Sequence, residues 1–148
     1  MKTKILVTLL VVMVLAACGK DKYTTKPQLT FKSVNTTLLQ PNQSIQFIIE
    51  VTDREGDIQD SIWVQKFEPN CPSSNFTAKY KMPDFNELKN LKGDIEVCFG
   101  YGINLGCAPI TGPFCPNRND TAVFKFWLQD KAKNMSDTIS SPAIVITR

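Results

Sequence analysis

The sequence predicts an all-β protein, an antiparallel β-sandwich of about seven strands that follows an N-terminal signal peptide. Short apolar runs recur between clusters of turn-forming residues over residues 29–148. Several of these runs alternate apolar and polar side chains, the period of two that is typical of a half-buried strand. After the signal segment, no stretch of the sequence keeps a helical period for more than two turns. Many short strands separated by turns indicate a sandwich.

The first 17 residues form the predicted signal peptide. Lys2 and Lys4 provide a charged start, and an apolar run from residue 5 to residue 17 is interrupted only by Thr8. The run is shorter than the roughly 20 residues of a membrane-spanning helix, but it fits the apolar core of a signal peptide. Residues 15–18, Leu-Ala-Ala-Cys, resemble the lipobox of bacterial lipoproteins. The resemblance implies that Cys18 becomes a lipidated N-terminus.

The predicted location is the cell envelope, with the chain anchored to a membrane through its lipid. Several acyl chains on one cysteine make such an anchor durable. Gly19, rather than an aspartate, follows Cys18, and this favours the outer membrane. Both the periplasmic face and the cell surface remain open. Residues 18–28 are polar and contain Pro27, so we expect the lipidated cysteine to be followed by a flexible tether.

The first four expected strands lie at residues 29–34, 44–52, 61–67 and 76–82. The second has the clearest pattern, because every second residue from Ile45 to Val51 is a large apolar residue. Turn-forming residues at 53–57 end it. Residues 83–91 fit either a loop or a helical turn.

Three more strands are expected at residues 94–101, 121–129 and 139–147. In the strand at 121–129, every second residue from Ala122 to Leu128 is apolar, and Trp127 falls on the other face. Pro142 marks a bend or an exposed edge in the last strand.

This strand order predicts an Ig-like sandwich formed by residues 29–148 as a single domain. Residues 44–62 (SIQFIIEVTDREGDIQDSI) and 124–147 (FKFWLQDKAKNMSDTISSPAIVIT), together with the lipobox and the tether, resemble small Ig-like lipoproteins of Bacteroidota. The resemblance covers nearly the whole mature chain. It implies the fold and the envelope location, and it implies no chemistry.

Five cysteines are present, and four remain after the lipid site: Cys71, Cys98, Cys107 and Cys115. In an oxidising compartment, these four predict two disulfides, for which three pairings are possible. The short, turn-rich segment 107–115 favours the pairs Cys107–Cys115 and Cys71–Cys98. The alternative is a four-cysteine zinc site, but no C-x₂-C spacing supports it.

Acidic residues gather in two predicted loops that an Ig-like sandwich places at the same end. If the loops meet, their oxygen atoms would suit calcium, the one cofactor that the sequence suggests. The candidate ligands are Asp53, Glu55, Asp57, Asp130, Asn134 and Asp137. The site is not an EF-hand, because the twelfth position from Asp53 is Val64. The alternative is that these residues are only turn formers, and Arg54, Lys131 and Lys133 add competing positive charge.

Three Asp-Ser/Thr-aliphatic triplets resemble the motif to which Bacteroidota attach O-glycans. The predicted acceptors are Ser61, Thr121 and Thr138. The alternative is that aspartate simply precedes β-branched residues at strand starts.

Composition argues against catalysis and against nucleic-acid binding. The chain has no histidine, which removes the commonest general base and zinc ligand. It has no Ser-x-x-Lys motif and no glycine-rich phosphate loop. Of 17 basic residues, two lie in the signal peptide, so 15 remain against 14 acids, and this balance gives no electrostatic footprint for nucleic acid.

We therefore expect a non-catalytic, membrane-anchored envelope lipoprotein that binds a protein or glycan partner. Aromatic residues such as Trp63 and Trp127 would serve binding if they are exposed, and the Gly- and Pro-rich segment 102–119 is a further candidate contact. The alternative is a structural spacer subunit in an outer-membrane complex. A continuous exposed aromatic patch would favour binding.

Overall fold

The computed structural model describes residues 23–103 and 106–148, so the predicted signal peptide and Cys18 lie outside the described residues. Nine strands and one short 3₁₀ turn form the domain. They are β1 (Gln28–Val34), β2 (Leu38–Leu39), β3 (Gln43–Asp53), β4 (Ser61–Phe67), η1 (Pro72–Ser74), β5 (Phe76–Lys81), β6 (Leu91–Tyr101), β7 (Ala108–Ile110), β8 (Asp120–Gln129) and β9 (Ile139–Ile146). No helix of the described residues is long and apolar enough to cross a membrane.

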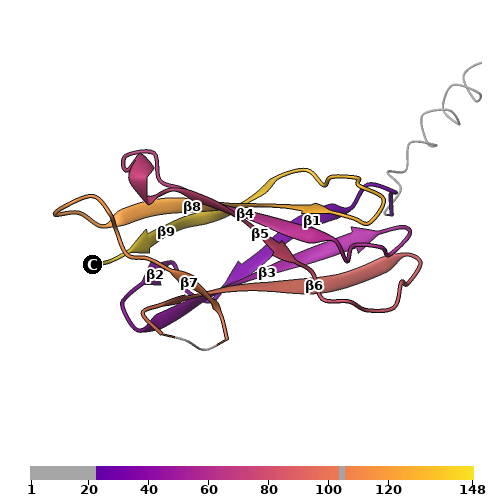
Figure 1. Ribbon diagram of the computed structural model, residues 1–148, viewed down its shortest axis with the longest axis horizontal. Coiled ribbons are helices and arrows are strands. Elements are labelled where there is room, and N and C mark those ends of the chain that lie inside the picture. Colours follow the sequence, from indigo (N-terminus) through magenta and orange to yellow (C-terminus); the bar gives the residue numbers. More distant parts are fainter. Residues whose placement is uncertain (1–22, 104–105) are drawn as a thin grey trace, which may run out of the picture.

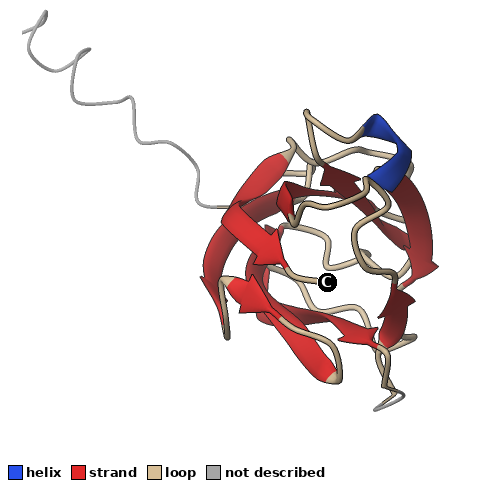
Figure 2. Cartoon of the chain, turned by 90° about the vertical axis from the view of Figure 1, so that its left-hand side faces the viewer, coloured by secondary structure: helices blue, strands red, loops and turns tan. Residues whose placement is uncertain are grey.

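The strands form two sheets, one in the order β1-β3-β6-β7 and the other in the order β2-β9-β8-β4-β5. Seen end-on, the strands surround a common interior (Figure 2). The prediction of an all-β protein is confirmed. The prediction of a purely antiparallel sandwich is wrong, because β2 runs parallel to β9 and β7 runs parallel to β6. Both parallel strands are only two or three residues long, too short to show a periodic pattern in the sequence.

The alternation of apolar and polar residues in the sequence explains which side chains form the core. Along β3 every second residue from Ile45 to Val51 is buried, and the same holds along β8 from Ala122 to Leu128. Aromatic rings from the two sheets meet between these strands, since the Phe47 ring lies 4.9 Å from that of Phe124 and 5.2 Å from that of Phe126, measured between centroids. Burial of such large side chains contributes about 1.5–3 kcal/mol each. The interior is therefore one continuous apolar core.

The two ends of the sandwich differ in what they hold. The short turn η1 and the C-terminus lie at one end, and the chain enters β1 at the opposite end (Figure 1). At the entry end, residues of the predicted tether contact the loop that joins β3 to β4. The backbone nitrogen of Arg54 donates to the carbonyl of Thr24 at 3.1 Å, and Pro27 is buried.

The disulfides join Cys71 to Cys115 and Cys98 to Cys107. Two disulfides among these four cysteines agree with the sequence prediction, but the favoured pairing of Cys107 with Cys115 and of Cys71 with Cys98 is wrong. The reason is strand pairing. Phe99 of β6 lies opposite Ala108 of β7. Cys98 and Cys107 directly precede these two residues, so they lie side by side.

Candidate functional site

The outer face of the five-stranded sheet carries both tryptophans of the chain. Trp63 of β4 and Trp127 of β8 lie directly opposite each other in the strand register. Their rings stack with centroids 5.9 Å apart and planes 7° from parallel. Both side chains are half-buried. The Trp63 Nε1–H is covered and has no hydrogen-bond partner among the described residues.

Lysines flank this aromatic pair. Lys79 of β5 lies opposite Trp63 on the other side, and its Nζ lies 5.3 Å from the ring centroid. One row along, Lys125 of β8 places its Nζ 4.9 Å from the centroid of the Phe67 ring, and Phe67 is 40% exposed. Because side chains alternate between the faces of a sheet, these five residues share the outer face. We call them the tryptophan face.

No carboxylate stands at an outward position of the strands that form this face. The outward residues of β4, β5 and the β8 segment beside them are neutral or lysine, and Lys81 at the end of β5 belongs to the same row as Gln129 of β8. The face is therefore aromatic and basic, although the chain as a whole is nearly neutral.

At the entry end, the structure brings three of the predicted calcium ligands together. One carboxylate oxygen from each of Asp53, Asp57 and Asp130 lies within 4.8 Å of the other two. Asp53 and Asp130 are fully buried, and Asp57 is half-buried. We call these three residues the acidic cluster. Their convergence agrees with the predicted meeting of the two loops.

Backbone hydrogen bonds hold the two loops of the cluster. Asp53 Oδ2 accepts from the backbone nitrogen of Gly56 at 2.6 Å. Gly56 has φ of +74°, and a Cβ there would collide with the backbone of Leu88, so only glycine fits. The backbone nitrogen of Lys131 donates to the Asp57 carbonyl at 2.9 Å, which fastens one loop to the other.

The other three predicted ligands have different partners. Glu55 is exposed and accepts from the Thr25 hydroxyl at 3.3 Å. Asp137 pairs with Lys26 at 2.5 Å. Asn134 donates from Nδ2 to Asp130 at 2.8 Å, so its side chain supports the cluster.

Burial raises the pKa of the Asp53 carboxyl, and the nearby negative charges of Asp57 and Glu55 add to this shift, while hydrogen bonds from two backbone N–H groups oppose it. Asp53 Oδ1 is buried with no hydrogen-bond partner among the described residues. The Asp53 carboxylate is therefore poorly compensated as an anion.

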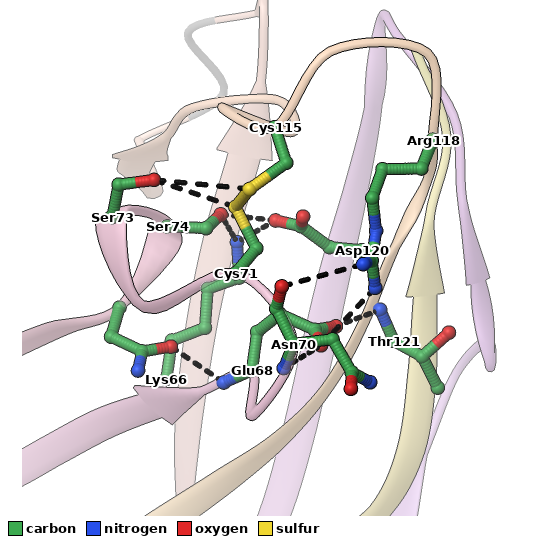
Figure 3. Close-up of polar contacts among 11 residues, drawn as sticks. Lys66, Glu68, Asn70, Cys71, Ser73, Ser74, Cys115, Arg118, Asp120 and Thr121 are labelled. Carbon is green, nitrogen blue, oxygen red and sulfur yellow. Dashed lines mark hydrogen bonds and ion pairs between the residues drawn. A yellow bond between two sulfur atoms is a disulfide. The ribbon is translucent and has the colours of Figure 1, made fainter.

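A second polar network lies at the opposite end, and the sequence analysis missed it (Figure 3). Lys66 Nζ lies 2.5 Å from Asp120 Oδ2 and donates to Ser74 Oγ at 2.7 Å. The Ser74 hydroxyl also donates to Asp120. The side chains of Lys66 and Asp120 are 1% and 0% exposed. The sequence does carry a signal for this pair, because each residue stands at an inward position of an otherwise apolar strand face.

Glu68 extends this network to the neighbouring loops. It is fully buried and accepts from the backbone nitrogens of Asn70 and Thr121, and Arg118 lies 3.7 Å from its Oε1. The Cys71–Cys115 disulfide lies beside it (Figure 3). The network closes this end of the core, and Ser74 is buried within it.

An apolar groove of about 540 Å³ opens between β5 and β6. Its lining includes Tyr80 and Met82 on one side and Ile95 and Phe99 on the other, and residues 106–108 of the Gly- and Pro-rich segment border it.

The three predicted O-glycan acceptors differ in accessibility. Ser61 is fully buried, so it is closed to an enzyme in the folded domain. Thr121 and Thr138 are exposed, and their modification stays a prediction.

Comparison with known proteins adds little to this geometry. The sequence matches no protein-family model and no curated protein. Among solved structures, the chain is similar to the sporulation control protein Spo0M from Bacillus subtilis, with 8% identity and a TM-score of 0.46 over 84% of this chain. The chain spans about half (51%) of the length of that protein.

Proposed function

We propose that this protein is a lipid-anchored, non-catalytic envelope protein that binds an acidic glycan chain through its tryptophan face. The observation that carries the proposal is the stacked pair of Trp63 and Trp127 on the outer face, with Lys79 and Lys125 beside it. These rings contribute nothing to the interior, because the core of β8 is formed by the residues that alternate with them.

The chemistry of the face suits a sugar polymer with carboxylate or sulfate groups. Aromatic rings offer flat apolar surface to the C–H faces of sugars. The lysine ammonium groups form charge-assisted hydrogen bonds with anionic substituents. The absence of outward carboxylates on these strands removes the repulsion that an anionic chain would meet.

Two observations favour binding over catalysis. The chain has no histidine, and the serine and lysine that do meet, Ser74 and Lys66, are buried at the far end of the sandwich. The anchoring part of the proposal rests on the lipobox at Cys18, and an outer-membrane location rests on Gly19 after it.

We also propose that the domain is Ig-like. The sheet orders β1-β3-β6 and β9-β8-β4-β5 support this, since they correspond to the A-B-E and G-F-C-C′ orders of immunoglobulin sheets. The short strand β7 is an addition to that pattern, because it follows β6 in the chain and runs parallel to it.

Tryptophan fluorescence gives a direct test, because both tryptophans of the chain belong to the face. Polygalacturonate is titrated into the purified protein, and a neutral glucan of equal length serves as the comparison. We expect a saturable change in emission with the polyuronate only, weakened by added salt. Lys79→Gln with Lys125→Gln should weaken binding by roughly a hundredfold, about tenfold for each charged contact.

A matched control uses Lys32→Gln, which removes a lysine from β1 of the other sheet and should leave the affinity unchanged. Equal binding of both glycans would overturn the acidic specificity. Equal weakening by Lys32→Gln would overturn the assignment to this face. The absence of any binding would favour the alternative, a spacer subunit.

A further inference from the structure

The acidic cluster brings three carboxylates together, and hydrogen bonds from N–H groups of Gly56 and Asn134 offset part of their negative charge. Two of its three carboxylates are fully buried, and one oxygen of each residue lies within 4.8 Å of the others. Among residues 23–103 and 106–148, no lysine forms an ion pair with any of the three. Like charges this close repel strongly in a buried setting.

The lysines nearest in sequence are engaged with other acids. Lys131 binds Glu87 at 3.0 Å, and Lys133 binds Asp60 at 2.5 Å. The positive charge that could have neutralised the cluster is therefore directed away from it.

A second, independent observation points to a ligand. Asp53 is 0% exposed, and its Oδ1 atom has no hydrogen-bond partner in the described part of the chain, although Oδ2 is held by the Gly56 N–H. Buried polar atoms are almost always satisfied. An orphan carboxylate oxygen in a group of three carboxylates is what a site prepared for a cation contains.

We propose that Asp53, Asp57 and Asp130 bind one calcium ion. All donors are carboxylate oxygens, which favours a hard cation over zinc or copper. Calcium binds oxygens at 2.3–2.6 Å, so two of its ligands can lie up to about 5 Å apart. The three oxygens lie within 4.8 Å of one another, a spacing that calcium can bridge, and water would complete its six to eight ligands.

The ion would fix the end of the domain at which the chain enters. Asp53 and Asp57 precede β4, and Asp130 follows β8. The same loops bind the entering segment, since Arg54 donates its backbone N–H to Thr24 and Asn134 donates its side-chain amide to the Thr25 carbonyl. Calcium would thus stabilise the contact between these loops and the segment through which the chain enters the domain.

Isothermal titration calorimetry of the purified, EDTA-treated protein with calcium chloride tests the site directly. We expect one ion per chain. At a hundredfold excess of calcium over its dissociation constant, Tm should rise on the order of 10 °C, and equal magnesium should give a smaller rise.

Asp57→Asn is the informative variant, because the Asp57 side chain makes none of the hydrogen bonds that shape the loops. It should bind calcium at least tenfold more weakly and should melt in EDTA no lower than the parent protein. Glu55→Gln, two residues away and outside the acidic cluster, is the matched control and should bind as the parent does. The proposal is overturned if millimolar calcium does not bind, if it raises Tm no more than magnesium does, or if Asp57→Asn and Glu55→Gln behave alike.

Discussion

Replacement of Lys66 by methionine tests the buried network at the η1 end of the sandwich. Lys66 and Asp120 form an ion pair at 2.5 Å with side chains 1% and 0% exposed, and Ser74 is their one shared hydroxyl partner. Methionine has a similar length and keeps the apolar stem of lysine. The variant therefore removes the charge with little change in volume.

We expect Lys66→Met to lower the free energy of unfolding by about 3–5 kcal/mol, the usual cost of leaving one member of a buried pair unpaired. The upper part of that range applies here, because Asp120 Oδ1 already has no hydrogen-bond partner. Most domains are stable by 5–15 kcal/mol, so this single change would remove a large share of the total.

Urea unfolding of the oxidised protein, followed by tryptophan emission, measures the effect. Lys66→Met combined with Asp120→Asn should recover at least half of the loss, because no charge is then buried without a partner. Lys81→Met is the control, since Lys81 pairs with Asp84 at the surface with both side chains more than 70% exposed, and its loss should cost under about 1 kcal/mol. A cost below 1 kcal/mol for Lys66→Met, or a double variant no more stable than Lys66→Met alone, would refute the reasoning.

Three further predictions concern the anchor, the disulfides and pH. Cys18→Ser should leave the precursor unprocessed and move it out of the detergent-extracted membrane fraction, and an unchanged N-terminus by mass spectrometry would contradict the lipid assignment. Loss of the bridge at Cys71, which closes 44 residues, should cost more stability than loss of the bridge at Cys98, which closes 9; chain entropy gives about 4 and about 2.6 kcal/mol, and urea unfolding of each Cys→Ser pair decides. Hydrogen bonding to Lys92 lowers the pKa of the Glu50 carboxyl, so its stabilising effect is present above the unfolded pKa and is lost as pH falls through the folded pKa. Melts of Glu50→Gln and the parent should therefore differ at pH 7 and converge in acid, and a constant difference would contradict this.

Sequence periodicity predicted the long strands well for a physical reason. β3 and β8 each bury one face completely, and a strand with one buried face must alternate. β2 and β7 were missed because two or three residues carry no period, and their partners are set by distant strands. β7 also explains why the predicted cysteine pairing was wrong. It places Cys107 beside Cys98, whereas a short loop in the sequence favoured Cys115.

The acidic loops show what the strand order predicts about the candidate site and what it does not. Their meeting followed from the predicted strand order, because loops that connect strands of an Ig-like sandwich share its ends. The sequence could not separate the three carboxylates that converge, and Asn134 beside them, from Glu55 and Asp137, which have other partners. Glu55 and Asp137 bond to Thr25 and Lys26, and these partners belong to a segment whose polarity indicated a free tether.

The position of a residue relative to the sheet surface decides which side chains of this domain build the core and which remain open to a partner. Lys66 and Asp120 are charged but point inward, where they neutralise each other and close the core. Trp63 and Trp127 are apolar but point outward, where the core gains nothing from them. Residue type alone would therefore place these four side chains on the wrong face. The alternation along β4 and β8 places them correctly, because successive side chains of a strand point to opposite faces of the sheet.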